Sequence, residues 1–203
     1  PWFWYDWANS AFVTTIGTVL YGPYITSIAK AAACPGQDSD LDCATNLSVL
    51  GIPIAPGSLA PYTTTVATIL SAIVLIFVGA IVDRMERPAA FLGLCAWGGA
   101  ASAAGLFFVT GDNWQLGSIL MILATVFLGS SLVTYDSMLN LIASPDDRDR
   151  VSSRGWALGY LGGGLLLAVN LVLVTMLPFG LSTGLAELPM PWFGERTTLG
   201  GPR

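Results

Sequence analysis

Long apolar segments that carry almost no charge determine what this chain can fold into. Five stretches approach or exceed the length of about 20 mostly apolar residues that a membrane-spanning helix needs. Of the 203 residues, 54% are hydrophobic and only 10% are charged, whereas a soluble domain carries about 25% charged residues. So few charged side chains cannot cover so large an apolar core in water, so we predict an all-α membrane protein. The five predicted spans are residues 8–32, 62–82, 89–109, 116–143 and 155–178.

The composition also argues against several functions. The chain contains no histidine, which is the usual general base and the commonest metal ligand. It shows no zinc-binding spacing, phosphate-binding loop or nucleophile elbow. We therefore predict no enzymatic activity, no metal site and no cofactor. The few basic residues form no patch, which argues against nucleic acid as a partner.

The basic residues predict the orientation of the helices. Positively charged residues near the ends of spans favour the cytoplasmic side of a membrane. The second and fourth connections hold Arg84, Arg87, Arg148, Arg150 and Arg154, whereas Lys30, Arg196 and Arg203 fall on the other side. We therefore expect the even connections and the amino terminus to be cytoplasmic.

The loop between the first two spans then faces outward, in a compartment that is usually oxidising. Cys34 and Cys43 both lie in it, so we predict a disulfide between them, with two free thiols as the alternative. Cys95 lies in an apolar span and is predicted to be a packing residue.

Polar side chains repeat along the first span. Ser10, Thr14, Thr18 and Tyr21 follow one another at offsets of four, four and three residues, which places them on one face of an α-helix. Asn9 lies beside this stripe, and Asn170 lies in the middle of the fifth span. Lipid offers no hydrogen bonds, so polar faces turn toward a wet cavity or toward other helices. The six residues are therefore candidates for solute binding, and hydrogen bonding between packed helices is the alternative.

The second connection carries a recognisable motif. Gly79 is followed after three residues by Asp83, Arg84 and then Arg87, a pattern that resembles the signature of the major facilitator superfamily. Glu86 stands where that signature has a second glycine. A carboxylate inside a membrane helix is costly, so it is usually there for a function. Asp136 in the fourth span is such a residue. We interpret it as a structural partner of the signature arginines, able to act as a gate latch, or as a proton-coupling group.

Two further segments carry a more specific resemblance. Residues 4–12 (Trp-Tyr-Asp-Trp-Ala-Asn-Ser-Ala-Phe) and 150–164 resemble the vacuole effluxer family, the autophagy-related branch of the major facilitator superfamily. Tyr135-Asp136 departs from that family's usual asparagine in the fourth helix.

The resemblance implies a major facilitator-type helical bundle of about twelve helices, of which five are present in this amino-terminal portion. Residues 181–203 would then be an extracytoplasmic tail before a missing sixth helix. The implied function is secondary transport of a small polar solute by alternating access, with amino acid efflux as in fungal members. The implied partners are the solute, the bilayer and the missing carboxyl-terminal half. The implied location is the plasma membrane of a bacterium or the vacuolar membrane of a fungus.

Two other functions are compatible with the residues. A half-size membrane protein could work as a homodimeric carrier or channel, or the chain could be a non-transporting membrane scaffold. Overlapping small-residue pairs at Gly155, Gly159 and Gly163 predict a close helix crossing in the fifth span. Such a crossing would serve the movement of a transporter or, alternatively, a dimer contact.

Overall fold

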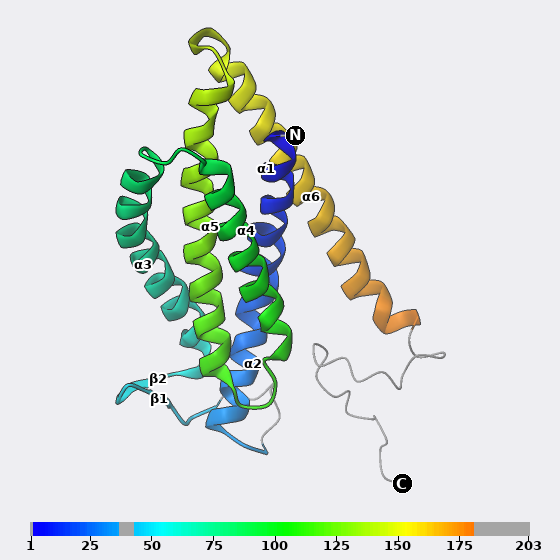
Figure 1. Ribbon diagram of the computed structural model, residues 1–203. Helices are drawn as coiled ribbons and strands as arrows, with labels where there is room; N and C mark the ends of the chain where they lie inside the picture. Colours follow the sequence, from blue (N-terminus) through cyan, green and yellow to red (C-terminus); the bar gives the residue numbers. More distant parts are fainter. Residues whose placement is uncertain (1, 37–42, 181–203) are drawn as a thin grey trace.

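The computed structural model describes residues 2–36 and 43–180, which form a bundle of long helices and a small hairpin (Figure 1). The first rod is continuous and comprises α1 (Trp2–Ala11), the π-helical η1 (Phe12–Leu20) and α2 (Tyr21–Ala33). The others are α3 (Leu59–Val82), α4 (Pro88–Gly105) with the short η3 (Leu106–Phe108), α5 (Trp114–Ile142) and α6 (Arg148–Gly180). Among the described residues, five helical rods are long and apolar enough to cross a membrane.

The first rod changes its helix type in the middle. In η1 each backbone N–H bonds to the carbonyl oxygen five residues earlier rather than four, and π-helical stretches of this length are rare. The hydroxyl of Thr18 donates to the carbonyl oxygen of Val13, five residues earlier, at 2.8 Å. Each turn of η1 therefore holds more residues than an α-helical turn, and the residues after Phe12 rotate away from their α-helical positions.

The rods pack in two groups. α5 lies along both α3 and α4, whereas α1 lies along α6 (Figure 1). Small residues permit these close approaches. Gly98 of α4 lies against the ring of Phe127 in α5, and Gly105 lies against Leu120 of the same helix. On α3 the buried side chains Thr63, Ala67 and Ser71 follow a four-residue spacing, which gives the helix one inward stripe.

The largest buried cluster lies at the end of the bundle where α2 ends and α3 begins. It includes Ile25, Leu47, Leu59, Val109 and Trp114, which come from five separate segments. The hairpin of β1 (Leu47–Val49) and β2 (Ile52–Ile54) is anchored here, and the short η2 (Pro56–Ser58) leads from it into α3. The hydroxyl of Tyr24 donates to the carbonyl oxygen of Val109 and ties the first rod to η3.

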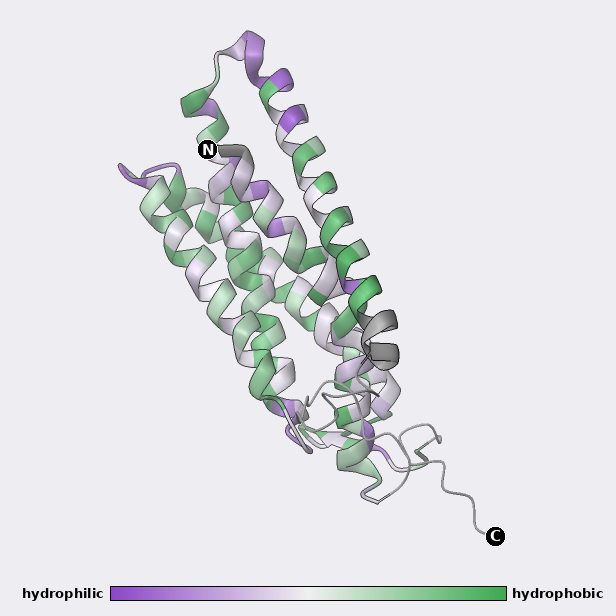
Figure 2. Ribbon diagram, turned by 90° about the vertical axis from the view of Figure 1, so that its right-hand side faces the viewer, coloured by the Kyte–Doolittle hydropathy of each residue, from purple (hydrophilic) through white to green (hydrophobic). Residues whose placement is uncertain are grey.

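The outer surface is apolar along the rods and polar at their ends (Figure 2). Ile76 is 73% exposed and Leu94 is 65% exposed, and many other large apolar side chains are exposed with them. Lipid is the natural cover for such a surface, because exposing so much apolar surface to water is unfavourable. The predicted all-α membrane protein is therefore confirmed, and the chain is a multi-pass membrane protein.

Several helix ends differ from the predicted boundaries. The first rod begins at Trp2 rather than at residue 8, and α6 begins at Arg148 rather than at residue 155. Aromatic and charged side chains continue the helices beyond their apolar centres, which apolarity alone does not register. The expected tail at 181–203, with Arg196 and Arg203, lies outside the described residues.

Candidate functional site

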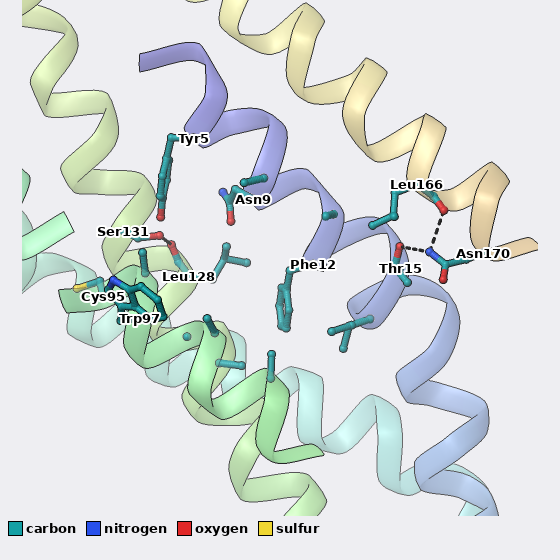
Figure 3. A pocket seen from close by; sticks show the side chains of 18 residues that line it. Tyr5, Asn9, Phe12, Thr15, Cys95, Trp97, Leu128, Ser131, Leu166 and Asn170 are labelled. Carbon is teal, nitrogen blue, oxygen red and sulfur yellow. Dashed lines mark hydrogen bonds between the residues drawn. The ribbon is translucent and has the colours of Figure 1, made fainter. Parts of the chain in front are cut away.

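A cavity of 630 Å³ lies between the first rod, α4, α5 and α6 (Figure 3). Apolar side chains make most of its wall, among them Phe12 on the first rod, Trp97 on α4 and Leu128 on α5. Its polar groups are few and uncharged: Tyr5, Asn9, Thr15, Ser131 and Asn170. An apolar wall with a small number of convergent polar groups is typical of a small-molecule site.

Asn170 links the two helices on one side of the cavity. Its Nδ2 donates to Oγ1 of Thr15 at 3.3 Å and to the carbonyl oxygen of Leu166 at 2.8 Å (Figure 3). These two bonds use both amide hydrogens and leave Oδ1 as an acceptor. Asn170 therefore shapes the cavity by holding α6 against η1, and it can still accept one hydrogen bond from a solute.

Asn9 and Tyr5 line the cavity nearer the start of the first rod (Figure 3). The ring of Tyr5 packs against that of Tyr135 with centroids 5.2 Å apart, and its hydroxyl lies beside the hydroxyl of Ser131. The amide of Asn9 lines the cavity and hydrogen bonds to no other described side chain. A partly buried amide that bonds to no described side chain has both donors and an acceptor to offer a ligand.

The predicted polar stripe does not stay on one face of the first rod, which corrects the sequence prediction. Ser10 and Thr14 face α6, where the hydroxyl of Thr14 donates to the carbonyl oxygen of Gly163 at 3.3 Å. Thr18 is exposed, and Tyr21 is buried in the core beside the hydroxyls of Thr63 and Ser118. The π-helical turn between Phe12 and Leu20 rotates the later residues out of line. For Ser10 and Thr14, the structure therefore shows packing between helices.

Glycines on α6 make this crossing unusually close. A methyl group added at Gly159 would overlap the carboxylate of Asp6, and one at Gly162 would come within 2.7 Å of the ring of Trp7. One at Gly163 would come within 3.0 Å of Thr14. Gly159 and Gly163, two of the small residues predicted to permit a close crossing, thus lie directly on the α1–α6 contact.

The signature turn between α3 and α4 forms without the expected ion pair. Asp83, Arg84 and Arg87 are exposed, and nothing lies close to Gly79. Among the described residues the structure pairs Arg150 with Asp147 at 2.8 Å and forms no ion pair between Asp136 and Arg84 or Arg87. The expected pair is therefore not present in this conformation.

Asp136 instead lies within electrostatic range of Asp6. Two carboxylates from different helices thus share the same end of the bundle. Within residues 2–36 and 43–180, no group of three or more Cys, Asp or Glu side chains is arranged to hold a metal ion.

Cys34 and Cys43 are joined by a disulfide, with their Cα atoms 6.0 Å apart. It closes the segment that leads from the end of α2 to the hairpin. Cys95 is a free, buried thiol in the wall of the cavity.

Sequence reasoning named Asn9 and Asn170 but missed the other cavity residues. Tyr5, Asn9, Phe12 and Ile16 follow one another at offsets of four, three and four residues, which is also one helical face. Two of these residues are wholly apolar, so a search for polar stripes passes over this face. Ala124, Leu128 and Ser131 show the same spacing on α5.

Comparisons with known proteins place the chain in a family. The model of the family described as "Vacuole effluxer Atg22 like" matches residues 1–182. The chain is similar to the "Uncharacterized MFS-type transporter YxiO" of Bacillus subtilis, with 25% identity over 175 residues. That match covers 86% of this chain and 37% of YxiO.

Fungal proteins named autophagy-related protein 22 are also similar to it. The one from Pyricularia oryzae is 31% identical over 107 residues, which cover 53% of this chain and 16% of that protein. The Aspergillus terreus protein 22-1 is 32% identical over 111 residues, or 55% of this chain and 18% of the relative. The chain thus spans well under half the length of these relatives.

No solved structure matches the chain. The family model nevertheless covers all the described residues, including both segments that carried the resemblance and all four walls of the cavity. The chain belongs to the Atg22-like vacuole effluxer family of major facilitator-type membrane transporters.

Proposed function

We propose that this chain is the amino-terminal portion of a secondary active transporter that moves a small polar solute, in the efflux direction, by alternating access. Amino acids are the proposed solute class. The observation that carries the proposal is a largely apolar cavity whose lining includes the amides of Asn9 and Asn170 (Figure 3). The membrane would be the plasma membrane in a bacterium or the vacuolar membrane in a fungus.

The chemistry of the cavity favours a small, uncharged or zwitterionic solute. The lining residues include no charged side chain, so polar recognition falls to neutral amides and hydroxyls. The free amide of Asn9 can both donate to a carboxylate and accept from an ammonium group. Phe12 and Trp97 provide an apolar wall for the rest of the solute. The choice of amino acids over other small polar solutes rests on the family resemblance.

The α1–α6 crossing supports movement between two states. Helices that meet through glycines make few interlocking side-chain contacts, so one can shift along the other. Asn170 joins these helices directly at the cavity. A solute that bonds to Asn9 and Asn170 would therefore bias the position of α6 relative to the first rod, as alternating access requires.

A second occupant of the cavity is favoured by the packing of the helices. α5 packs extensively against both α3 and α4, whereas the one extensive contact that α1 makes with another rod among the described residues is with α6. The relatives are much longer than this chain. A further helix of the complete protein would fit against the apolar face of the first rod that includes Phe12 and Ile16. In that case the further helix fills the cavity, and the solute path lies elsewhere.

Thermal stabilisation of the complete gene product, screened against amino acids, sugars and nucleosides, tests the proposal. A ligand present at a hundred times its Kd adds about 2.7 kcal/mol of stability. We expect a hit among the amino acids that is lost in Asn9→Ala and Asn170→Ala. Asn140→Ala, at the exposed end of α5, is the matched control and should keep the hit.

Labelling of a cysteine at Ala100, in the cavity wall, separates the two occupants. The variant Ala100→Cys is made in a Cys95→Ser background and treated with a small thiol reagent. Protection that appears only with solute supports the binding site. Protection without any solute shows a helix in the cavity and overturns the assignment of Asn9 and Asn170.

Two further outcomes decide between the alternative functions. Transport by a protein shown to be monomeric would exclude the homodimeric carrier. A complete gene product that binds and transports nothing in the panel would favour the scaffold.

A further inference from the structure

We infer that the hairpin between α2 and α3 is a membrane-interface anchor whose tip, Leu50 and Ile52, rests in the headgroup region of the bilayer. This function is separate from solute transport and does not depend on the identity of the solute. The anchor would hold the start of α3 at a fixed depth and tilt relative to the membrane.

The base of the hairpin is fixed to the bundle at the correct depth. Leu47 is buried in the core cluster with Ile28 and Leu59, and Pro56 begins the next membrane-spanning segment directly after β2. The disulfide between Cys34 and Cys43 restrains the chain just before β1. Figure 1 shows the hairpin projecting sideways from this end of the bundle, across the direction of the helices. The tip therefore extends along the membrane plane at the end of the rods.

The tip exposes apolar side chains. Val49 pairs with Ile52, so Leu50 and Gly51 form a two-residue turn, with φ of 53° and 85°. Such turns favour Asn-Gly, because both central residues need positive φ. Leu50 is an unfavourable residue for such a turn, because a leucine rarely adopts positive φ. It is also unfavourable in water, since its side chain is 99% exposed, and that of Ile52 is 63% exposed. Neither side chain belongs to the buried core of the described residues, so the apolar surface of both is available to a partner outside that core.

The bilayer is the occupant that the surrounding surface indicates. From residue 44 to residue 82 the chain contains no Asp, Glu, Lys or Arg. The hairpin is therefore continuous with the exposed apolar surface of α3, on which Tyr62, Val66 and Ile69 follow one another from the same end. Tyrosines near the ends of spans collect at the headgroup level of a bilayer. Because lipid covers the exposed surface of α3, the uncharged tip beside it meets the same membrane.

Site-directed fluorescence tests the anchor. Leu50→Cys and, as a second reporter, Ile52→Cys are made in a Cys95→Ser background of the complete gene product, with the Cys34–Cys43 disulfide retained. Each is labelled with an environment-sensitive dye and reconstituted into phosphatidylcholine vesicles. Asp112→Cys, in the exposed turn before α5 at the same end of the bundle, is the matched control. Quenching is measured with aqueous iodide and with lipids that carry a nitroxide near the headgroup.

We expect the dyes at residues 50 and 52 to be quenched by the lipid nitroxide and to be several-fold less sensitive to iodide than the dye at residue 112. Equal iodide quenching at all three positions would show a tip in water and overturn the proposal. Protection from iodide without nitroxide quenching would also overturn it, because the tip would then be covered by protein. Neither result bears on solute binding by Asn9 and Asn170.

Discussion

Asn170 of α6 donates a hydrogen bond from Nδ2 to Oγ1 of Thr15, across 3.3 Å and from one rod to another. Thr15 lies in the π-helical part of the first rod, where the backbone is already displaced from α-helical positions. π-helical stretches occur frequently at functional sites. The two residues thus connect the irregular part of the first rod to the helix that crosses it most closely.

This hydrogen bond predicts energetic coupling between Asn170 and Thr15. Asn170→Ala, Thr15→Val and the double variant form a double-mutant cycle, read from the free energy of unfolding of the reconstituted protein. Interhelical hydrogen bonds in membranes average about 0.6 kcal/mol, with a maximum of about 1.7 kcal/mol. We expect a coupling energy in that range, and strictly additive single effects would contradict the contact.

The α1–α6 crossing predicts opposite effects at two neighbouring glycines. A methyl at Gly162 would come within 2.7 Å of the Trp7 ring, whereas at Gly164 nothing lies within 4 Å. Overpacking typically costs about 1 to 3 kcal/mol, while alanine is favoured over glycine in a helix by up to about 1 kcal/mol. Gly162→Ala should therefore lower the melting temperature, and Gly164→Ala should preserve or raise it. Two equal shifts would show that the crossing is looser than described.

The disulfide predicts protected thiols and a stability contribution. In a Cys95→Ser background, Cys34 and Cys43 should resist thiol labelling until a reductant is added. Cross-linking residues nine apart in the sequence contributes about 2 to 3 kcal/mol in the chain-entropy model. Cys34→Ser with Cys43→Ser should lower the free energy of unfolding by that order. Ready labelling of the untreated protein would exclude the bond.

The proximity of Asp6 and Asp136 predicts that removing one carboxylate does not harm the fold. Like charges within range repel each other, and for partly exposed groups the effect is at most about 1 kcal/mol. Asp136→Asn should leave stability at neutral pH unchanged or slightly higher. Asp112→Asn, in the turn at the other end of the bundle, is the control. A marked loss of stability in Asp136→Asn would show that this carboxylate has a favourable partner.

The same variant decides between the two hypotheses for Asp136. If this residue couples transport to protons, solute uptake driven by a pH gradient should fall sharply in Asp136→Asn. If it acts as a latch with Arg84 or Arg87 in another conformation, uptake should persist while the rate of exchange between states changes. Intact pH-driven uptake at an unchanged rate would contradict both.

Much of this architecture could be predicted from the sequence, because helices in a bilayer are formed by local bonds. In lipid every backbone N–H and C=O must be satisfied within its own helix, so the length of an apolar run fixes where a span lies. The charged segments at 83–87 and 144–147 separate the spans for the same reason. The disulfide could be predicted from two cysteines in one short loop. The close helix crossing could be predicted from glycines spaced by four residues on the fifth span.

The direction in which each side chain points was decided only by the tertiary structure. Residues 10, 14, 18 and 21 would share a face in an α-helix, but the π-helical turn between them sends Thr18 to the surface and Tyr21 into the core. The cavity combines four segments, and its wall includes apolar residues that a search for polar patterns omits. The expected contact of Asp136 with the arginines also failed, because it depends on how α5 is rotated in the bundle. Periodicity describes one helix at a time. The direction of a side chain, the cavities and the ion pairs depend on contacts between residues that are far apart in the chain.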